Sequence, residues 1–361
     1  MTSPLRLVIL GLSITSSWGN GHATTFRGLV RELTARGHDV LFLERDVPWY
    51  ASNRDLPHPS YGRTELYGGL AELEERFASD VRDADAVIVG SYVPEGVVVG
   101  QWVQRTARGV KAFYDIDTPV TLAKLERGDF EYLSPELIPG YGLYLSFAGG
   151  AALTRLEQDY GSPCARPFYC SVDPALYAPE DASPGWDLGY MGTYSDDRQP
   201  PLDRLLVEPA RRWGEGRFVV AGPQYPNTLV WPPNVARIEH LPPAEHRAFY
   251  NKQRWTLNIT RADMVAVGYS PSVRLFEAAA CGVPILSDYW EGLETFFALG
   301  TEIVVTRSAE ETLRALRQTS KEERQAIAAR ARARVLAAHT AAHRAAELEN
   351  HLNEARGTAT G

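Results

Sequence analysis

Hydrophobic residues gather in short runs that alternate with loops and with segments of helical spacing. The first run, Leu5–Leu10, is typical of a strand in a parallel sheet that is covered on both faces. A glycine-containing loop follows, then an amphipathic segment at Thr24–Arg36, which Gly37 ends, and a second apolar run at His38–Leu43. This order of strand, helix and strand predicts a right-handed βαβ unit.

The same alternation continues along the chain, while Trp49–Tyr67 is polar and proline-rich and is expected to be a loop. Further helices are expected at 69–82, 95–108, 270–281 and 308–355, and further strands at 86–90, 110–114, 143–147, 186–191, 217–221, 254–259 and 283–287. The prediction is an α/β fold with two doubly wound, Rossmann-like domains that face a central cleft. The first domain is expected at 1–167 and the second at 168–335, with a helix and tail at 336–361 that pack back on the first.

Composition narrows the class of protein. A length of 361 residues suits two domains, and a net charge of −8 argues against nucleic acid as a partner. The three cysteines form no CxxC pair, and no apolar run reaches the ~20 residues of a membrane span. The first apolar run leads directly into Ser16–His22 without a small-residue cleavage site. We therefore expect a cytoplasmic protein with no integral membrane segment.

The strongest chemical signal is the segment Ser270–Pro284. Ser270 is expected to cap a helix with Pro271 in its first turn, which leaves the amides of Ser272 and Val273 free to bind an anion such as a diphosphate. Glu277 lies about two turns into this helix and could accept hydrogen bonds from a ribose diol. The alternative is an ordinary capped helix in which Arg274 and Glu277 form an i,i+3 ion pair.

Other candidate donor-binding residues follow strands of the second half, where such sheets present ligands. Arg198 and Arg261 suit phosphate oxygens, although a single arginine is more often a solvated surface charge. Gly192 and Gly222 lie at strand ends and complete the set in this half.

In the first half, Gly19 and Gly21 would let the backbone approach the donor, although they form neither a dinucleotide fingerprint nor a Walker loop. His22 is expected at the start of the first helix, facing the cleft, as a catalytic residue or as a mere capping residue. Trp18 precedes it on the acceptor side.

Asp115 and Asp117 follow an apolar strand and are expected to reach the ligand. The spacing invites a metal-binding interpretation, but Asp83 and Asp85 share it by chance, so we expect no metal. Acceptor-hydroxyl binding by Asp115, catalysis by Asp117, or helix capping explains the pair better.

These segments together resemble the spore-maturation-type (CgeB-like) glycosyltransferases, a branch of the GT-B group. The resemblance extends over nearly the whole chain, through 17–24, 43–50, 115–119, 146–150, 189–194 and 274–284. It implies that Glu277 holds the donor ribose, that Arg198 and Arg261 bind the diphosphate, and that the first half binds the acceptor. It departs at Tyr269, where many retaining relatives have a glutamate, and Asp263 could take over that role.

The resemblance implies a metal-independent, retaining transfer of sugar from a nucleoside diphosphate sugar, expected to be a UDP-sugar, to a hydroxyl acceptor. No other cofactor is expected. Under inversion, His22 or Asp117 would be the base. The alternatives are a nucleotide-sugar epimerase of the same shape and a non-catalytic sugar-binding protein.

Overall fold

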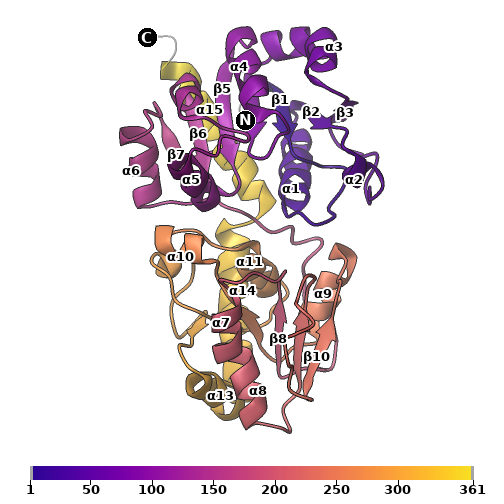
Figure 1. The fold of residues 1–361 in the computed structure, drawn as a ribbon, viewed down its shortest axis with the longest axis vertical. Coiled ribbons are helices and arrows are strands. Elements are labelled where there is room, and N and C mark those ends of the chain that lie inside the picture. Colours follow the sequence, from indigo (N-terminus) through magenta and orange to yellow (C-terminus); the bar gives the residue numbers. More distant parts are fainter. Residues whose placement is uncertain (1–2, 359–361) are drawn as a thin grey trace. The chain divides into compact units, whose positions relative to one another are not determined.

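The computed structural model describes residues 3–358. Two compact units divide the chain, and each contains one parallel sheet with helices on both faces (Figure 1). Unit 1 comprises Met1–Ser171 and Ala341–Gly361, and unit 2 comprises Val172–Thr340. The chain therefore leaves unit 1 at residue 171 and returns to it at residue 341.

Unit 1 is built on seven parallel strands in the order β3-β2-β1-β4-β5-β6-β7. Its strands are β1 (Arg6–Gly11), β2 (Asp39–Arg45), β3 (Arg63–Tyr67), β4 (Ala86–Gly90), β5 (Val110–Asp115), β6 (Leu143–Ser146) and β7 (Ala165–Pro167). Its helices are α1 (His22–Ala35), α2 (Pro48–Ala51), α3 (Leu70–Asp83), α4 (Gly96–Thr106), α5 (Thr118–Arg127), η1 (Pro135–Gly140), α6 (Ala151–Gln158) and α15 (Ala341–Thr358).

The central strands of unit 1 are apolar because helices cover both faces of the sheet. Residues 7–11 of β1 are all buried, and β1 pairs with β2 on one side and β4 on the other. Helix α15 packs along α1 and contributes Ala345, Leu348 and Leu352 to the same core as Phe26 (Figure 1). The last helix of the chain is thus part of the first unit.

Unit 2 has six parallel strands in the order β10-β9-β8-β11-β12-β13. Its strands are β8 (Leu188–Met191), β9 (Phe218–Ala221), β10 (Val235–Ile238), β11 (Thr256–Asn258), β12 (Ile285–Ser287) and β13 (Val304–Val305). Its helices are α7 (Gln199–Leu202), η2 (Asp203–Val207), α8 (Glu208–Arg212), α9 (Pro243–Asn251), α10 (Ala262–Val267), α11 (Val273–Ala280), α12 (Leu293–Phe296), α13 (Ala309–Gln318) and α14 (Lys321–Ala338).

The predicted α/β class with two doubly wound units is confirmed. The expected loop at 49–67 is wrong at its end, because β3 forms there as a half-exposed edge strand that pairs only with β2. The single helix expected at 308–355 is also wrong. It is three helices, because the Ser320 side chain caps a new helix start and the helix that precedes His339 ends there.

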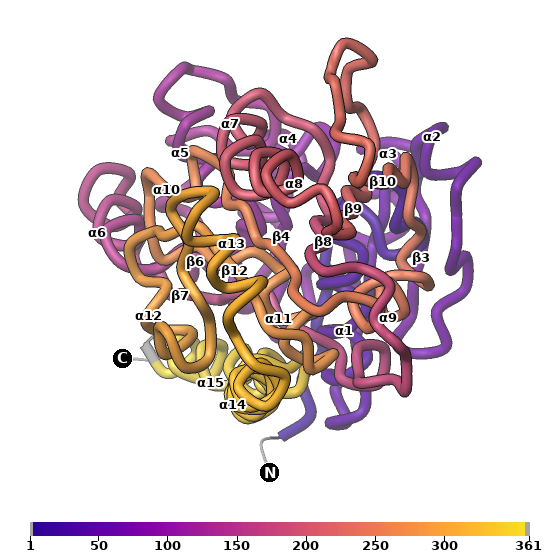
Figure 2. The backbone as a smooth tube through the Cα atoms, turned by 90° about the horizontal axis from the view of Figure 1, so that it is seen from below, coloured from indigo at the N-terminus to yellow at the C-terminus, as the bar shows by residue number. Residues whose placement is uncertain are grey.

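The segment that joins β9 to β10 extends away from the sheet of unit 2 as a long loop (Figure 2). Arg237 anchors the base of this loop. Its guanidinium donates to the carbonyls of Val220 and Gly222 and lies 4.1 Å from the ring centroid of Tyr225 and 5.0 Å from that of Trp231. Among residues 3–358, no helix has the length and apolar character needed to cross a membrane.

Candidate functional site

Three arginines gather at the carboxyl edge of the unit 2 sheet. Arg198 follows β8, Arg261 follows β11, and Arg274 lies in the first turn of α11. β8 and β11 are neighbours and run parallel, so the segments that follow them leave the sheet at the same edge. Within the described part of the chain, none of the three guanidinium groups has a carboxylate partner within 4.0 Å.

Arg198 is buried, with 7% of its surface exposed, so it is not the solvated surface charge of the alternative interpretation. Its Nε donates to Ser195 Oγ at 2.9 Å and its Nη2 to the Thr193 carbonyl at 2.6 Å. Burial lowers the pKa of Arg198, and the positive charges of Arg274 and Arg261 lower it further. An anion at this edge would relieve that repulsion.

The helix that was expected to begin at Ser270 begins instead at Val273, with Ser272 as its N-cap residue. The Ser272 hydroxyl donates to Asn258 Oδ1 at 2.7 Å and makes no capping bond to its own helix. Arg274 Nη1 lies 3.2 Å from the same oxygen. No side chain caps this helix start, so the amides of its first turn keep their capacity to bind an anion.

The tip of this segment is partly accessible. Ser270 and Pro271 are buried, whereas Ser272, Val273 and Arg274 are half-buried. The predicted anion-binding amides therefore move by about one residue, to Val273 and Arg274, but remain within reach of a solute.

Two carboxylates lie near the arginines, and backbone amides hold both. Asp197 accepts from the Ala262 amide at 2.8 Å, and Asp288 accepts from the Thr260 amide at 3.0 Å. Burial raises the pKa of Asp288, which opposes the effect of its hydrogen bonds and of Arg274. Neither carboxylate forms an ion pair with the three arginines within 4.0 Å among the described residues.

Close packing requires glycine at positions 192 and 222. A Cβ on Gly222, whose φ is +141°, would lie 2.1 Å from the Gly192 carbonyl oxygen. A Cβ on Gly192 would lie 2.5 Å from the Tyr190 hydroxyl. The two loops therefore pass too close for any side chain, independently of a ligand.

Glu277 is 4% exposed, in the second turn of α11. The Tyr250 hydroxyl donates to its Oε2 at 3.1 Å, and Tyr177 lies nearby, where burial and the Glu277 charge raise the pKa of Tyr177. The ion pair with Arg274 that the alternative interpretation requires is not formed among the described residues. The Tyr250 hydroxyl thus holds one oxygen of the carboxylate.

In unit 1, His22 and Asp117 come together at the carboxyl edge of the sheet. His22 Nε2 lies 3.6 Å from Asp117 Oδ2, and the His22 ring packs edge-on against Tyr92 with the centroids 5.5 Å apart. His22 is 6% exposed, and its buried Nδ1 has no hydrogen-bond partner. The carboxylate is 41% exposed, so the pair joins a sheltered imidazole to a solvent-facing acid.

Asp115 is not exposed at this edge, contrary to expectation. It is fully buried and accepts from the Tyr144 hydroxyl at 2.6 Å, the Thr121 hydroxyl at 2.7 Å and the Asp117 amide at 3.3 Å. Burial raises its pKa to about 6 despite these bonds. Asp115 therefore lies beneath Asp117 and accepts a hydrogen bond from its amide, and the acceptor role predicted for Asp115 stays a prediction.

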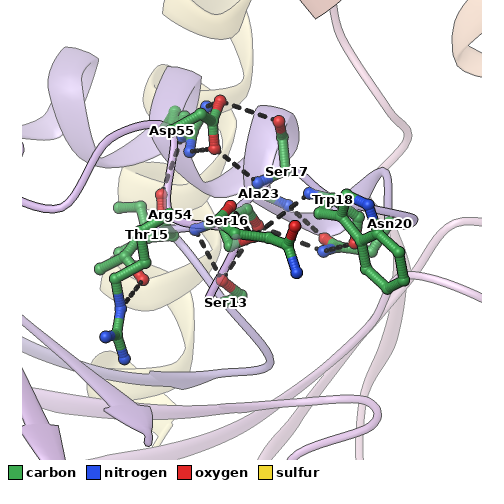
Figure 3. A network of polar contacts seen from close by, with 12 residues as sticks. Ser13, Thr15, Ser16, Ser17, Trp18, Asn20, Ala23, Arg54 and Asp55 are labelled. Carbon is green, nitrogen blue, oxygen red and sulfur yellow. Dashed lines mark hydrogen bonds and ion pairs between the residues drawn. The ribbon is translucent and has the colours of Figure 1, made fainter. Parts of the chain in front are cut away.

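The loop after β1 is tied to its neighbours by a polar network (Figure 3). Asn20 Oδ1 accepts from the Ala23 amide at 3.0 Å, so Asn20 caps α1 and His22 does not. Gly19, at φ +68°, and Gly21 both have open space where a Cβ would be, which suits close approach by a ligand. Trp18 is 51% exposed.

Sequence reasoning missed several residues of both edges. Tyr92 follows β4 with a positive φ of 62° and packs against Tyr132, with ring centroids 4.5 Å apart and the rings tilted by 38°. In unit 2, Asn258 ends β11 and holds both Ser272 and Arg274. Their position directly after strands was the available signal. Among the described residues, no three His, Cys, Asp or Glu side chains are grouped as metal ligands.

Comparisons with known proteins bear on the fold and on the family. Residues 198–350 match the model of the family described as glycosyl transferase-like. Anabaena Alr3699/HepE in complex with UDP-glucose superposes with a TM-score of 0.72 at 11% identity, over 97% of this chain and 100% of that one. The fold is that of GT-B glycosyltransferases.

Two further structures extend the likeness. Sucrose-phosphate synthase from Thermosynechococcus elongatus gives a TM-score of 0.68 at 12% identity, over 96% of this chain and 98% of that one. AviGT4, a glycosyltransferase involved in avilamycin A biosynthesis, gives 0.59 at 15% identity, over 97% of each chain. No curated protein matches the sequence.

Proposed function

We propose that the protein is a glycosyltransferase that moves a sugar from a nucleoside diphosphate sugar, with UDP as the nucleotide, to a hydroxyl acceptor. The observation that carries this proposal is the group of Arg198, Arg261 and Arg274 beside an uncapped helix start, without carboxylate partners within 4.0 Å among the described residues. A diphosphate carries the complementary charge. The match of residues 198–350 and the UDP-glucose of a structural neighbour support the same donor.

In the reaction, the bond between the sugar C1 and the diphosphate oxygen breaks, and a bond forms between C1 and the acceptor oxygen. The acceptor hydroxyl loses its proton. The three arginines and the first amides of α11 stabilise the negative charge that develops on the leaving diphosphate, so the transfer needs no metal ion. Turnover is expected to persist in excess EDTA.

Glu277 is proposed to bind the ribose. The carboxylate is already held by Tyr250, so it is oriented before a donor arrives. Glu277→Ala is expected to weaken donor binding, whereas an unaltered affinity would remove Glu277 from the site.

For stereochemistry we propose retention, with His22 in contact with the transferred sugar and the leaving diphosphate taking the acceptor proton. One observation favours the alternative of inversion: His22 Nε2 lies 3.6 Å from Asp117 Oδ2, an arrangement that can orient an imidazole base. Proton NMR of the first-formed product from an α-linked donor distinguishes the two, because retention gives only the α anomer. The resemblance to the spore-maturation-type branch stays a prediction, as does cytoplasmic localisation.

The decisive experiment is calorimetric titration of UDP and UDP-glucose into the wild type and into Arg198→Ala and Arg274→Ala. Loss of one charged hydrogen-bond donor is expected to weaken binding by about 10- to 100-fold. Arg324→Ala is the matched control, because Arg324 is a half-buried arginine of unit 2 whose pKa is also lowered by burial. It lies near Arg254 and Asp187, at the opposite edge of the sheet.

Equal losses in all three variants would mean that the arginines act on stability and not on the donor. Conversion of UDP-glucose to an isomer without any acceptor would assign the fold to an epimerase. Binding of free sugar with indifference to UDP would assign it to a sugar-binding protein.

A further inference from the structure

The two exposed tryptophans of the protein lie in adjoining loops of unit 1. Of eight tryptophans, the other six are buried or half-buried, while Trp18 is 51% and Trp49 is 56% exposed. Trp18 lies in the loop after β1 and Trp49 in the short helix α2 after β2, and these two strands are paired neighbours. Large aromatic side chains left in water at one edge of a sheet indicate a binding surface.

The two loops are joined to each other. Ser16 Oγ donates to the Asn53 carbonyl at 2.7 Å, and Asn53 Nδ2 donates to the Trp49 carbonyl at 2.7 Å. On the other side, Tyr50 packs against Trp49, with centroids 5.8 Å apart, and the Trp18 amide donates to Ser16 Oγ at 3.3 Å. Both tryptophans are thus held by one continuous set of contacts.

The support beneath the tryptophans is rigid. Glu44 is fully buried and accepts from the amides of Ile14 and Thr15 at 2.7 and 2.9 Å. Arg27 pairs with both oxygens of Asp55 at 2.9 Å, and Asp55 in turn holds Ser17. The Trp18 indole takes no part in the contacts drawn in Figure 3 and lies at their edge. Such a support holds the backbone of both tryptophans in place, which reduces the loss of loop entropy on binding.

The charges near the tryptophans exclude an anionic partner. Arg54 pairs with Asp46, Arg45 pairs with Glu95, and Arg27 pairs with Asp55, so the positive charges of these loops are neutralised. An anionic lipid surface or a nucleic acid needs unpaired basic residues. A neutral ligand with an apolar face and polar edges fits better.

A sugar ring has that chemistry. One face of a pyranose carries C–H bonds that pack on the electron-rich face of an indole, and its rim carries hydroxyls that amides and carboxylates bind. We propose that Trp18 and Trp49 bind the sugar rings of an acceptor that is itself a saccharide. The proposal rests on the proposed glycosyltransferase function and assigns the acceptor class for it.

The test uses Trp18→Ala and Trp49→Ala with maltose, cellobiose and N,N′-diacetylchitobiose as probes, followed by saturation-transfer NMR and by UDP release from UDP-glucose. At least one disaccharide is expected to bind the wild type and accept sugar. Each alanine variant is expected to raise its KM about tenfold or more, as loss of an aromatic stack does, while the Kd for UDP is unchanged. Trp18→Phe and Trp49→Phe are expected to restore much of the loss.

Leu299→Ala is the control, because it removes a comparably exposed apolar side chain, 41% exposed, from unit 2. Binding to none of the disaccharides, equal binding by the alanine variants, or binding to phosphatidylglycerol vesicles that is lost in the same variants would each overturn the proposal. The NMR arm runs without a donor. Failure of UDP binding would therefore refute the glycosyltransferase function, while saccharide contact with the tryptophans would be decided independently.

Discussion

The carboxyl edges of the two sheets carry opposite chemistry on the same architecture. Unit 1 presents His22, Asp117 and two exposed indoles, whereas unit 2 presents Arg198, Arg261 and Arg274 without ion pairs among the described residues. Parallel sheets bring loop residues together at this edge in both cases. The difference teaches that the fold fixes the place of a site, while a few side chains after each strand determine which ligand it takes.

The largest expected effect comes from a substitution at the carboxyl edge of the unit 1 sheet. His22→Ala removes the imidazole that is proposed to contact the transferred sugar, and it is expected to lower kcat by about 10²-fold or more because the sugar is no longer held in position. The Kd for UDP is expected to stay unchanged because the arginines lie in unit 2. Steady-state kinetics and calorimetry on one preparation measure both values. A parallel loss of UDP affinity would show that His22 also serves the donor.

The next effect comes from a backbone position at the carboxyl edge of the unit 2 sheet. Gly222→Ala places a Cβ 2.1 Å from the Gly192 carbonyl oxygen at a φ of +141°. A destabilisation of about 3 kcal/mol or more is expected from the clash and the strained backbone. Thermal unfolding should show the loss, with Gly214→Ala, which has open space for a Cβ, as the mild control. A fully stable Gly222→Ala protein would mean that the loops can separate freely.

A third prediction concerns the pH dependence of stability that the buried Asp115 of unit 1 produces. The pKa of Asp115 is about 6 in the folded protein and 3.8 in the unfolded reference. Between pH 3.8 and 6 the folded protein therefore keeps a proton on Asp115 that the unfolded chain has lost. Stability of the wild type therefore falls as pH rises from 4 to 7, by about 2 to 3 kcal/mol relative to Asp115→Asn. Urea unfolding of both proteins across this range measures the difference. Parallel pH profiles would contradict the raised pKa.

The smallest effect concerns salt. Donor binding at the arginine edge is expected to weaken by less than about tenfold as ionic strength rises toward 1 M, because Arg198 is buried and incompletely screened. Saccharide binding at Trp18 and Trp49 is expected to be insensitive to salt. Calorimetry of UDP and NMR of disaccharides in the same buffers compare the two edges directly. Equal salt dependence would remove the electrostatic distinction between them.

The strands at the centre of each sheet could be predicted from sequence because burial on both faces makes them apolar, as in β1 and β9. The edge strand β3 could not, since it pairs on one side only and reads Arg-Thr-Glu-Leu-Tyr. A hydrophobic pattern in the sequence reflects burial of the side chains, and the side chains of an edge strand are less buried than those of a central strand.

Candidate residues directly after strands were placed at the expected edges, but their accessibility was not predictable. Asp115 and Asp117 are two residues apart, yet one is fully buried among hydroxyls from Thr121 and Tyr144 and the other is 41% exposed. Those hydroxyls come from separate elements, which a single sequence does not connect. The uncapped start of α11 likewise depends on Asn258, which draws the Ser272 side chain away.

The placement of α15 has a consequence for biosynthesis. Glu349 in this helix pairs with Arg36, at 2.6 Å, and with His38, and Leu348 and Leu352 complete the core around Phe26. A ribosome synthesises the first 171 residues and then all of unit 2 before it adds this helix. The amino-terminal half therefore emerges with one apolar flank open, and the half made second can finish folding before the half made first.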